Sequence, residues 1–355
     1  MVASEFRRQL RDELEAHDLL GDARSREACA EEARIAGERA LTQLQALAGA
    51  RTVRDALSVR RGPQFAQTYR YVIGFGQLMT EFLIAPVPLD ERGRRRVARL
   101  GGIANLIVSH FDELVDGGWP RALLLPRWAL VIAQARAGRA VLRVGAAIAP
   151  APARLTVRLV ADYFRRVADL PYVTCHPNVR ADLRRTIVAM YLEEGRTPRE
   201  HRRRRGDATR QKKTALPLVV LGQAAWLASP ECPVPLYRRH RRWLVHVGKF
   251  IRWIDDAADL AADREAGAAN VVCRALRRRP AAAYAGLAAG IARRGRRLVD
   301  EWRAQTGRGS AEVSGDERTL QSVLAAVLVA WVGRPDSEHA SMKDGPKPLP
   351  ELTSG

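Results

Sequence analysis

Apolar residues recur along most of this chain at spacings of three and four, which is the period of an α-helix rather than of a β-strand. Alanine, leucine and arginine, all of which favour helices, dominate the pattern. The alternating β-branched runs and tight-turn signals of hairpins are missing. We therefore predict an all-α protein that folds as a single-domain antiparallel helical bundle.

Clusters of proline and glycine divide the helical pattern into segments. The predicted helices cover residues 4–18, 23–58, 62–85, 90–116, 120–148, 153–169, 176–194, 208–228, 236–263, 268–276, 280–305 and 315–333. Residues 335–355 contain four prolines and many polar residues without periodicity, which is typical of disorder. The sequence thus predicts one domain over residues 1–334, followed by a disordered tail over 335–355.

The chain has 59 Lys and Arg against 39 Asp and Glu in 355 residues, giving a net charge of +20. This excess is compatible with nucleic acid, anionic lipid or a phosphorylated substrate, and does not choose among them. The four scattered cysteines predict reduced thiols. The longest apolar run covers about 15 residues, 215–229, whereas a membrane span needs roughly 20. No signal-peptide stretch is present, so we expect a cytoplasmic protein without a transmembrane segment.

A first acidic cluster lies at the end of the predicted helix 90–116. Asp112, Glu113 and Asp116 are three and four residues apart, so they project from one face. The preceding residues 100–109 are nearly uncharged, which predicts that most of this helix is buried. A helix C-terminus carries partial negative charge, so it disfavours acids at this position.

A second acidic cluster ends the predicted helix 236–263, where Asp255, Asp259 and Asp263 step by four with Asp256 beside them. Like charges at this spacing cost roughly a few tenths of a kcal/mol per pair, and more where water is removed. Each cluster alone could be a solvated face, but two favour a polyvalent cation. Because the clusters offer oxygen ligands and no cysteine, they suit Mg²⁺ rather than zinc. Mg²⁺ commonly bridges carboxylates to phosphates, which indicates a phosphate-bearing ligand between the clusters.

The two clusters resemble the aspartate-rich motifs of the class I isoprenoid (terpenoid) synthases, especially the trans-isoprenyl diphosphate synthase-like branch. The segment Asp112-Glu113-x-x-Asp116 resembles the first motif. The segment Gly248-x-x-x-Arg252-x-x-Asp255-Asp256-x-x-Asp259 resembles the second, with Arg252 where the family usually has Gln. Between them, Gly195-Arg196 resembles the end of a Met-x-x-Gly-Gln segment and Lys213-Thr214 a downstream Lys-Thr pair. The resemblance spans roughly residues 95–275.

This resemblance implies an isoprenoid synthase fold around a central cavity, with three Mg²⁺ ions that bind the substrate diphosphate. The implied metal ligands are Asp112, Glu113, Asp116, Asp255, Asp256 and Asp259. The implied catalytic residues are Asp112, Asp255, Lys213 and Arg252. The implied substrate-binding residues are Lys213, Arg252, Arg196, Arg121, Phe75, Phe111 and Trp253. Arg252 could instead only neutralise the acidic cluster, and the aromatic residues could be ordinary core; the family also suggests a homodimer.

Two departures from the family bear on the reaction. Condensing synthases hold isopentenyl diphosphate with a Gly-Gly-Lys-x-x-Arg segment, and residues 69–82 contain no such lysine. They also carry an Arg pair after the first motif, where this chain has Arg121 alone. We therefore predict a terpene synthase that ionises a linear C15 or C20 prenyl diphosphate and cyclises the allylic cation. The alternative is a trans-prenyltransferase that condenses an allylic diphosphate with isopentenyl diphosphate or another acceptor.

A different class of function is suggested by the basic run from Arg196 to Lys213, which has nine basic residues in eighteen. Such a run can neutralise nucleic-acid phosphates. It contains no aromatic residue on which a base could stack, so no nucleic-acid partner is expected. A non-catalytic homologue is a third interpretation, which the intact acidic clusters oppose.

Overall fold

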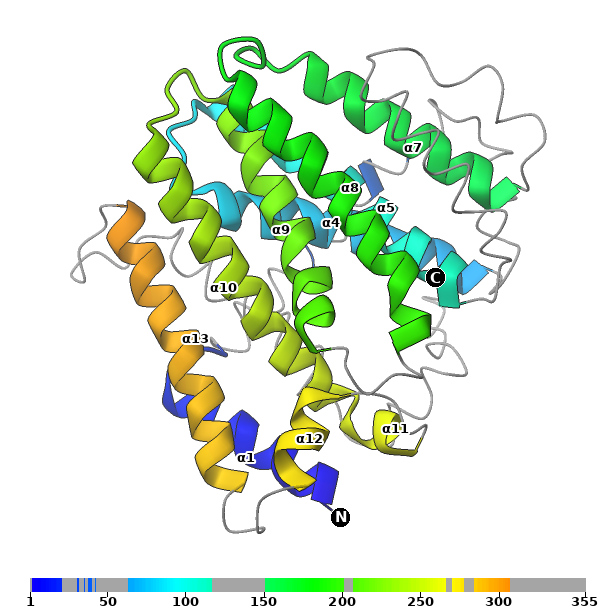
Figure 1. Cartoon of the computed structure of the whole chain (residues 1–355), viewed down its shortest axis with the longest axis vertical. Coiled ribbons are helices and arrows are strands. Elements are labelled where there is room, and N and C mark those ends of the chain that lie inside the picture. Colours follow the sequence, from blue (N-terminus) through cyan, green and yellow to red (C-terminus); the bar gives the residue numbers. More distant parts are fainter. Residues whose placement is uncertain are drawn as a thin grey trace, which may run out of the picture.

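A computed structural model describes residues 2–20, 31, 35, 38, 39, 42, 63–116, 151–200, 207–265, 270–277 and 284–306. Every secondary-structure element in these ranges is helical, which confirms the all-α prediction. The helices are α1 (Val2–Ala16), α4 (Pro63–Ile84), α5 (Glu91–Asp116), α7 (Ala151–Ala168), α8 (Pro177–Glu200), α9 (Asp207–Ala228), α10 (Val234–Ala258), α11 (Leu260–Glu265), α12 (Val271–Arg277) and α13 (Tyr284–Thr306). They pack as the bundle shown in Figure 1.

Most predicted helices are confirmed within about four residues, with two clear differences. Helix α8 ends at Glu200, six residues beyond the predicted end at 194. The predicted helix 236–263 is two helices, because Asp259 caps α10 with φ −86° and ψ 6° and α11 begins at the next residue. The predicted helices 120–148 and 315–333 and the tail 335–355 lie outside the described residues. The same holds for 23–58, apart from five positions.

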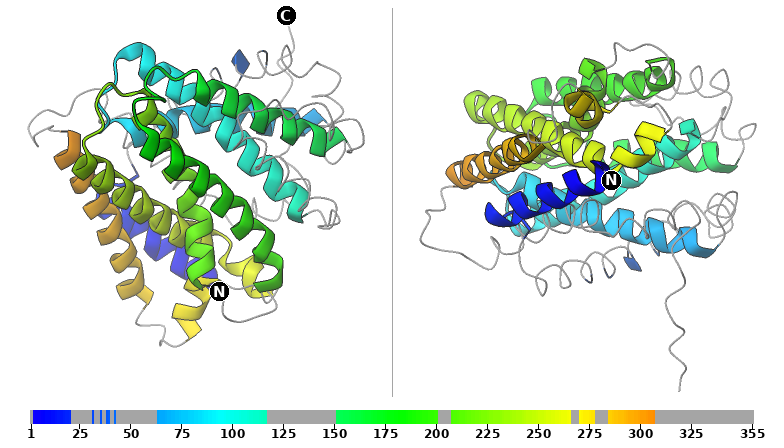
Figure 2. Two further views of the ribbon diagram at one scale, coloured as in Figure 1. Left: turned by 45° about the horizontal axis from the view of Figure 1, so that its top comes forward. Right: turned by 90° about the horizontal axis from the view of Figure 1, so that it is seen from below.

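The direction of the helices decides which motifs can meet. Short connections join α8, α9 and α10, which pack side by side and therefore run antiparallel in turn. The start of α5 lies where α9 ends: the Ser229 hydroxyl donates to the Pro88 carbonyl oxygen over 2.9 Å. Consequently α5, α8 and α10 end, and α9 begins, at one end of the bundle, which we call the motif end (Figure 2).

Helices α4 and α5 cross in unusually close contact. A Cβ atom on Gly101 of α5 would lie 1.7 Å from the Thr80 hydroxyl oxygen of α4, a distance that no side chain can adopt. Close by, the Asn105 amide donates a hydrogen bond to the Val72 carbonyl oxygen over 2.7 Å. Position 105 is two helical turns before position 112, so the helix face that carries the first acidic cluster also carries the contact with α4.

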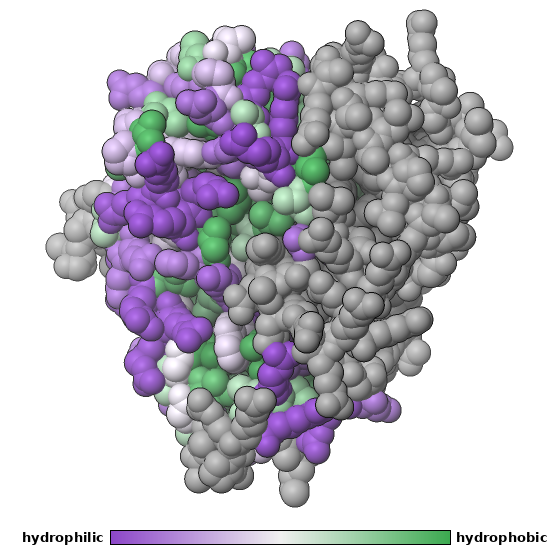
Figure 3. All heavy atoms as spheres, in the orientation of Figure 1, coloured by the Kyte–Doolittle hydropathy of each residue, from purple (hydrophilic) through white to green (hydrophobic). Residues whose placement is uncertain are grey.

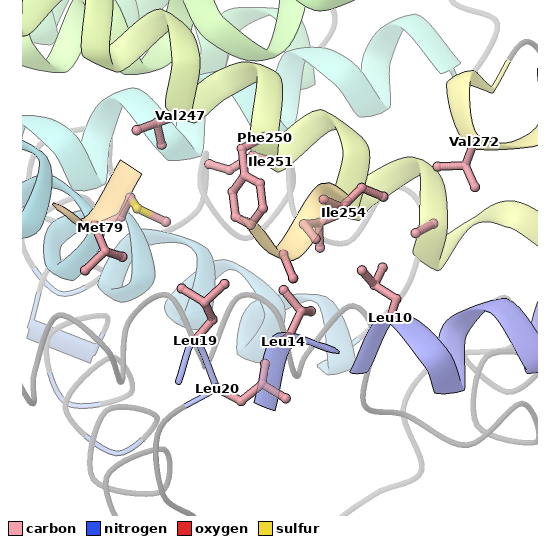
Figure 4. Packing of buried hydrophobic residues seen from close by; sticks show 14 of the residues in the cluster. Leu10, Leu14, Leu19, Leu20, Met79, Val247, Phe250, Ile251, Ile254 and Val272 are labelled. Atoms are coloured by element: carbon pink, nitrogen blue, oxygen red, sulfur yellow. The ribbon is translucent and has the colours of Figure 1, made fainter. Parts of the chain in front are cut away.

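Two groups of buried apolar side chains hold the bundle together. One lies among α5, α7, α8 and α9, and the other joins α1, α4, α10 and α13. In Figure 4, Leu10 and Leu14 of α1 lie below Phe250 and Ile254 of α10. Phe82 sits between Trp243 and Trp302, 5.6 Å from each ring centroid, and is part of the core.

His240 of α10 is a buried polar junction between three helices. Its Nδ1 accepts a hydrogen bond from the Trp226 indole of α9 over 3.0 Å, so its proton is on Nε2. Nε2 donates to the Leu83 carbonyl oxygen at the end of α4 over 2.8 Å. Burial lowers the pKa of His240 to about 4, against a partial opposing effect of the bond to Leu83.

We expect His240 to make the fold sensitive to acid. The unfolded chain binds a proton here below about pH 6.5 while the folded chain stays neutral, so stability falls by roughly 3 kcal/mol as the pH drops from 6.5 to 4. The variant His240→Gln should lose this part of the pH dependence, as measured by urea unfolding at several pH values. The variant of the exposed His246 on the same helix, His246→Gln, should retain it. An unchanged slope in His240→Gln would contradict the assignment.

Candidate active site

The second acidic motif lies at the motif end, on the last turns of α10. The Arg252 guanidinium donates to an Asp256 carboxylate oxygen over 2.5 Å and lies 3.9 Å from a carboxylate oxygen of Asp255. The Arg252 side chain is 13% exposed, that of Asp256 3% and that of Asp255 43%. The three residues therefore form one cluster, whose basic member is mostly buried and whose outer carboxylate is open to solvent.

Asp256 also joins the end of α10 to the start of α12. Its second carboxylate oxygen accepts a hydrogen bond from the Val271 amide over 2.7 Å. Its backbone oxygen accepts one from the Asn270 side chain over 2.5 Å. Burial raises the pKa of Asp256, and the Arg252 guanidinium and the Val271 amide counteract part of that effect. Both carboxylate oxygens are thus engaged within the protein, so a role of Asp256 as a metal ligand stays a prediction.

Asn270 is a site residue that sequence reasoning missed. Its side-chain oxygen accepts from the Cys273 amide over 2.8 Å, which caps the first turn of α12. Its side-chain nitrogen donates to a carboxylate oxygen of Asp263 over 2.9 Å, so the last acid of the second acidic cluster is bound within the protein. The signal was available, because an asparagine directly before a short helix is a typical N-cap.

Asp255 and Asp259 are the motif carboxylates that the structure leaves accessible. They stand one turn apart, and the Asp259 amide donates to the Asp255 carbonyl oxygen over 3.0 Å. Exposed carboxylate oxygens suit Mg²⁺, which uses few protein ligands and keeps several waters. Among the side chains that the structure describes, no three His, Cys, Asp or Glu form a metal-binding group. The side chains of Asp112, Glu113 and Asp116 are outside the described residues. The carboxylates of Asp255 and Asp259 therefore fit one half of the predicted metal site.

The glycine of the second motif lets α9 approach α10 closely. A Cβ atom on Gly248 would lie 2.4 Å from the Ala215 Cα and 2.9 Å from the Ala215 backbone nitrogen. Because Gly248 is one turn before Arg252, the first turns of α9 run beside the acidic motif. Lys213 is two residues before Ala215, so its backbone lies in this region, although its side chain is outside the described residues.

For most of the remaining predicted site residues the structure describes only the backbone. Asp112, Glu113, Asp116 and Phe111 belong to the last turns of α5, and Arg196 to the second half of α8. These segments run to the motif end, but their side chains are outside the described residues. Arg121 lies outside them entirely. The structure therefore brings the backbones of the four predicted motifs to one end of the bundle.

The two described aromatic candidates lie in different surroundings. Phe75 is half-buried on α4 and packs against the core of α1, α4, α10 and α13. Trp253 faces α13, with the Arg294 guanidinium 5.8 Å above its ring, and it lines a groove of about 270 Å³ between α10 and α13. This contact makes Trp253 part of a helix interface, so its predicted role in substrate binding gains no support.

No protein-family model and no curated protein sequence matches this chain. Among solved structures, the chain is similar to a polyprenyl synthase from Caulobacter crescentus CB15 complexed with calcium and isoprenyl diphosphate, with 15% identity and a TM-score of 0.46 over 89% of this chain and 98% of that one. It is also similar to an FPP/GFPP synthase from Zymomonas mobilis, with 17% identity and a TM-score of 0.41 over 81% and 98%.

The cluster predicts that neighbouring aspartates have different roles. Asp256→Asn should destabilise the fold by about 3 kcal/mol, because it leaves the mostly buried Arg252 without its counter-charge. Asp255→Asn should change stability by less than about 1 kcal/mol, since Asp255 is partly exposed and 3.9 Å from the guanidinium. Urea unfolding of the two variants tests this split. Equal losses would show that Asp256 is not the anchor of the cluster.

Proposed function

We propose that this chain is a Mg²⁺-dependent class I terpene synthase that ionises a linear prenyl diphosphate. The observation that carries the proposal is the meeting of four separate motif segments at one end of the bundle. Their residues lie on three helices that end there and one that begins there. An assembly of carboxylates and basic residues from distant parts of a chain is the arrangement that a metal–diphosphate site requires.

In this proposal the described residues have distinct tasks. The partly exposed Asp255 and the exposed Asp259 would contribute carboxylate oxygens to the metal, and Asp256 fixes Arg252 beside them through the 2.5 Å ion pair. Arg252 then keeps its remaining guanidinium nitrogens for Asp255 and for an approaching phosphate. Bound Mg²⁺ would neutralise the negative charge that develops on the diphosphate leaving group.

Basic residues from two other helices complete the proposed site. Lys213 lies on the segment of α9 that packs closely against α10 at Gly248. Arg196 lies on the part of α8 that runs to the motif end. Lysine would meet the diphosphate as a point charge, whereas arginine would offer a planar fork to phosphate oxygens. Together with the metal they favour breakage of the carbon–oxygen bond and formation of an allylic cation.

The fate of the cation is cyclisation in our main proposal. The missing lysine in residues 69–82 and the lone Arg121 remove two groups that would hold isopentenyl diphosphate. A C15 or C20 substrate is the expected length. Condensation with isopentenyl diphosphate or another acceptor is the second candidate. Chain synthesis is the activity for which both similar solved structures are named, so it has to be tested in the same assay.

The metal site is tested with variants of both motifs. Asp112→Ala and Asp255→Ala should each lower diphosphate release from C15 or C20 prenyl diphosphate by about a hundredfold or more, because loss of a metal ligand removes charge stabilisation of the leaving group. Chelation of Mg²⁺ should have the same effect. Asp12→Ala, a change of an exposed acid on α1, serves as the control. Full activity in either motif variant, with an unchanged circular dichroism spectrum, would refute the proposal.

The reaction type is tested by product analysis. We expect wild-type protein with one allylic diphosphate and Mg²⁺ to give a cyclic hydrocarbon or alcohol, identified by gas chromatography and mass spectrometry. Addition of isopentenyl diphosphate should leave this product unchanged. A longer prenyl diphosphate that forms only when isopentenyl diphosphate is present would establish condensation instead.

A further inference from the structure

The end of the bundle opposite the motif end exposes aliphatic side chains. Among the described residues three large hydrophobic side chains are exposed, and two of them, Val234 (53%) and Leu236 (49%), stand in the first turn of α10. Single exposed aliphatic residues are common on protein surfaces. These two lie on either side of Pro235 in the first turn of the helix and follow Pro233 at its N-cap, so the start of α10 forms an aliphatic protrusion.

Exposed arginines follow this protrusion directly along α10. They are Arg238, Arg239, Arg241 and Arg242. Val234, Arg238 and Arg242 are four residues apart, so Val234 and these two arginines share one helix face, whereas Leu236 lies on another side of the first turn. The opposite face of the same turns is buried through Tyr237, His240 and Trp243, which fixes the outward direction of the basic face.

The basic surface continues onto the start of α5 and the end of α7. A groove of about 570 Å³ joins apolar residues such as Pro88, Tyr172 and Pro230 to Arg92 and Arg96. Its neighbour, of about 660 Å³, shares these two arginines and adds further arginines, namely Arg95, Arg99 and Arg166. Asp90, Glu91 and Asp169 also line the grooves, and Glu91 is paired with Arg95 over 2.7 Å. Basic residues therefore outnumber acids across both grooves.

We propose that this basic end, defined by Val234, Leu236, the four exposed arginines of α10 and the α5 arginines of the two grooves, docks on an anionic lipid membrane. Aliphatic side chains that protrude amid arginines match a bilayer surface, where the apolar groups enter the headgroup region and the cations meet lipid phosphates. In Figure 3 hydrophilic residues surround a few hydrophobic ones at the upper left, where α10 begins.

Two further considerations select lipid as the partner. A nucleic acid would be held by the arginines but gains nothing from exposed valine and leucine, whereas an anionic bilayer is complementary to both. The contact is peripheral, since no described helix is long and apolar enough to cross a membrane. Docking by this end would leave the motif end facing the aqueous phase, so the inference goes beyond the proposed reaction and does not depend on it.

The test is co-sedimentation of the full chain with vesicles. Wild-type protein should bind vesicles of phosphatidylcholine with 30 mol% phosphatidylserine and release at high salt, and it should bind pure phosphatidylcholine vesicles at least about tenfold more weakly. Val234→Ser/Leu236→Ser should weaken binding to the mixed vesicles by about tenfold, because the aliphatic contact is lost. Arg238→Gln/Arg239→Gln should do the same, because two cations near the surface are removed.

A matched control distinguishes binding by this surface from binding that depends only on the net charge of the protein. Arg8→Gln/Arg11→Gln removes two exposed arginines from α1, at the other end of the bundle in Figure 1, and should leave vesicle binding within about twofold of wild type. Thermal unfolding of each variant verifies that it is folded. Equal losses in the control, or full binding by Val234→Ser/Leu236→Ser, would overturn the proposal. Displacement of the protein from mixed vesicles by duplex DNA at a concentration equal to that of the protein would also overturn the proposal, in favour of a nucleic-acid surface.

Discussion

Close helix contacts that only glycine permits set the geometry of this bundle. Gly101 brings α5 against Thr80 of α4, and Gly248 brings α10 against the Ala215 backbone of α9. A side chain at either position would overlap atoms of the neighbouring helix, and a packed interior yields little to such an overlap. The two contacts therefore fix the spacing within the helix pairs that carry the acidic motifs and Lys213. The arrangement of the motif residues at the motif end therefore depends on the close approach of these helix backbones.

Charge is distributed in opposite ways at the two ends of the bundle. At the motif end the described acids are few and organised: Asp256 is buried and paired, and Asp255 and Asp259 remain accessible. At the basic end arginines are numerous and exposed beside aliphatic side chains. A net charge of +20 describes neither end. Function in both proposals depends on local arrangement, because a carboxylate held in a buried ion pair and an exposed carboxylate behave differently although each carries one negative charge.

Helix periodicity was enough to predict most of the fold, including α5 and α9 to within about two residues. It failed at Asp259, because the capping turn that ends α10 continues the same apolar spacing into α11. It missed Asn270, whose cap and contact with Asp263 depend on the return of the chain from α10 to α12. The family resemblance implied a place for Trp253 near the substrate; its ring lies against Arg294 of α13, and its role in substrate binding stays a prediction. Contacts between helices, which periodicity does not encode, explain each difference.

The sequence by itself determined the helical class, the approximate helix bounds and the residue types from which a metal–diphosphate site could be built. These follow from local spacing, since residues three and four apart share a helix face whatever surrounds them. Only the tertiary structure decided that α5, α8 and α10 end where α9 begins, and that Asp256 is buried while Asp255 is partly exposed. Burial and helix direction depend on segments far apart in the chain, so a position's accessibility to metal, substrate or membrane is decided when those segments pack.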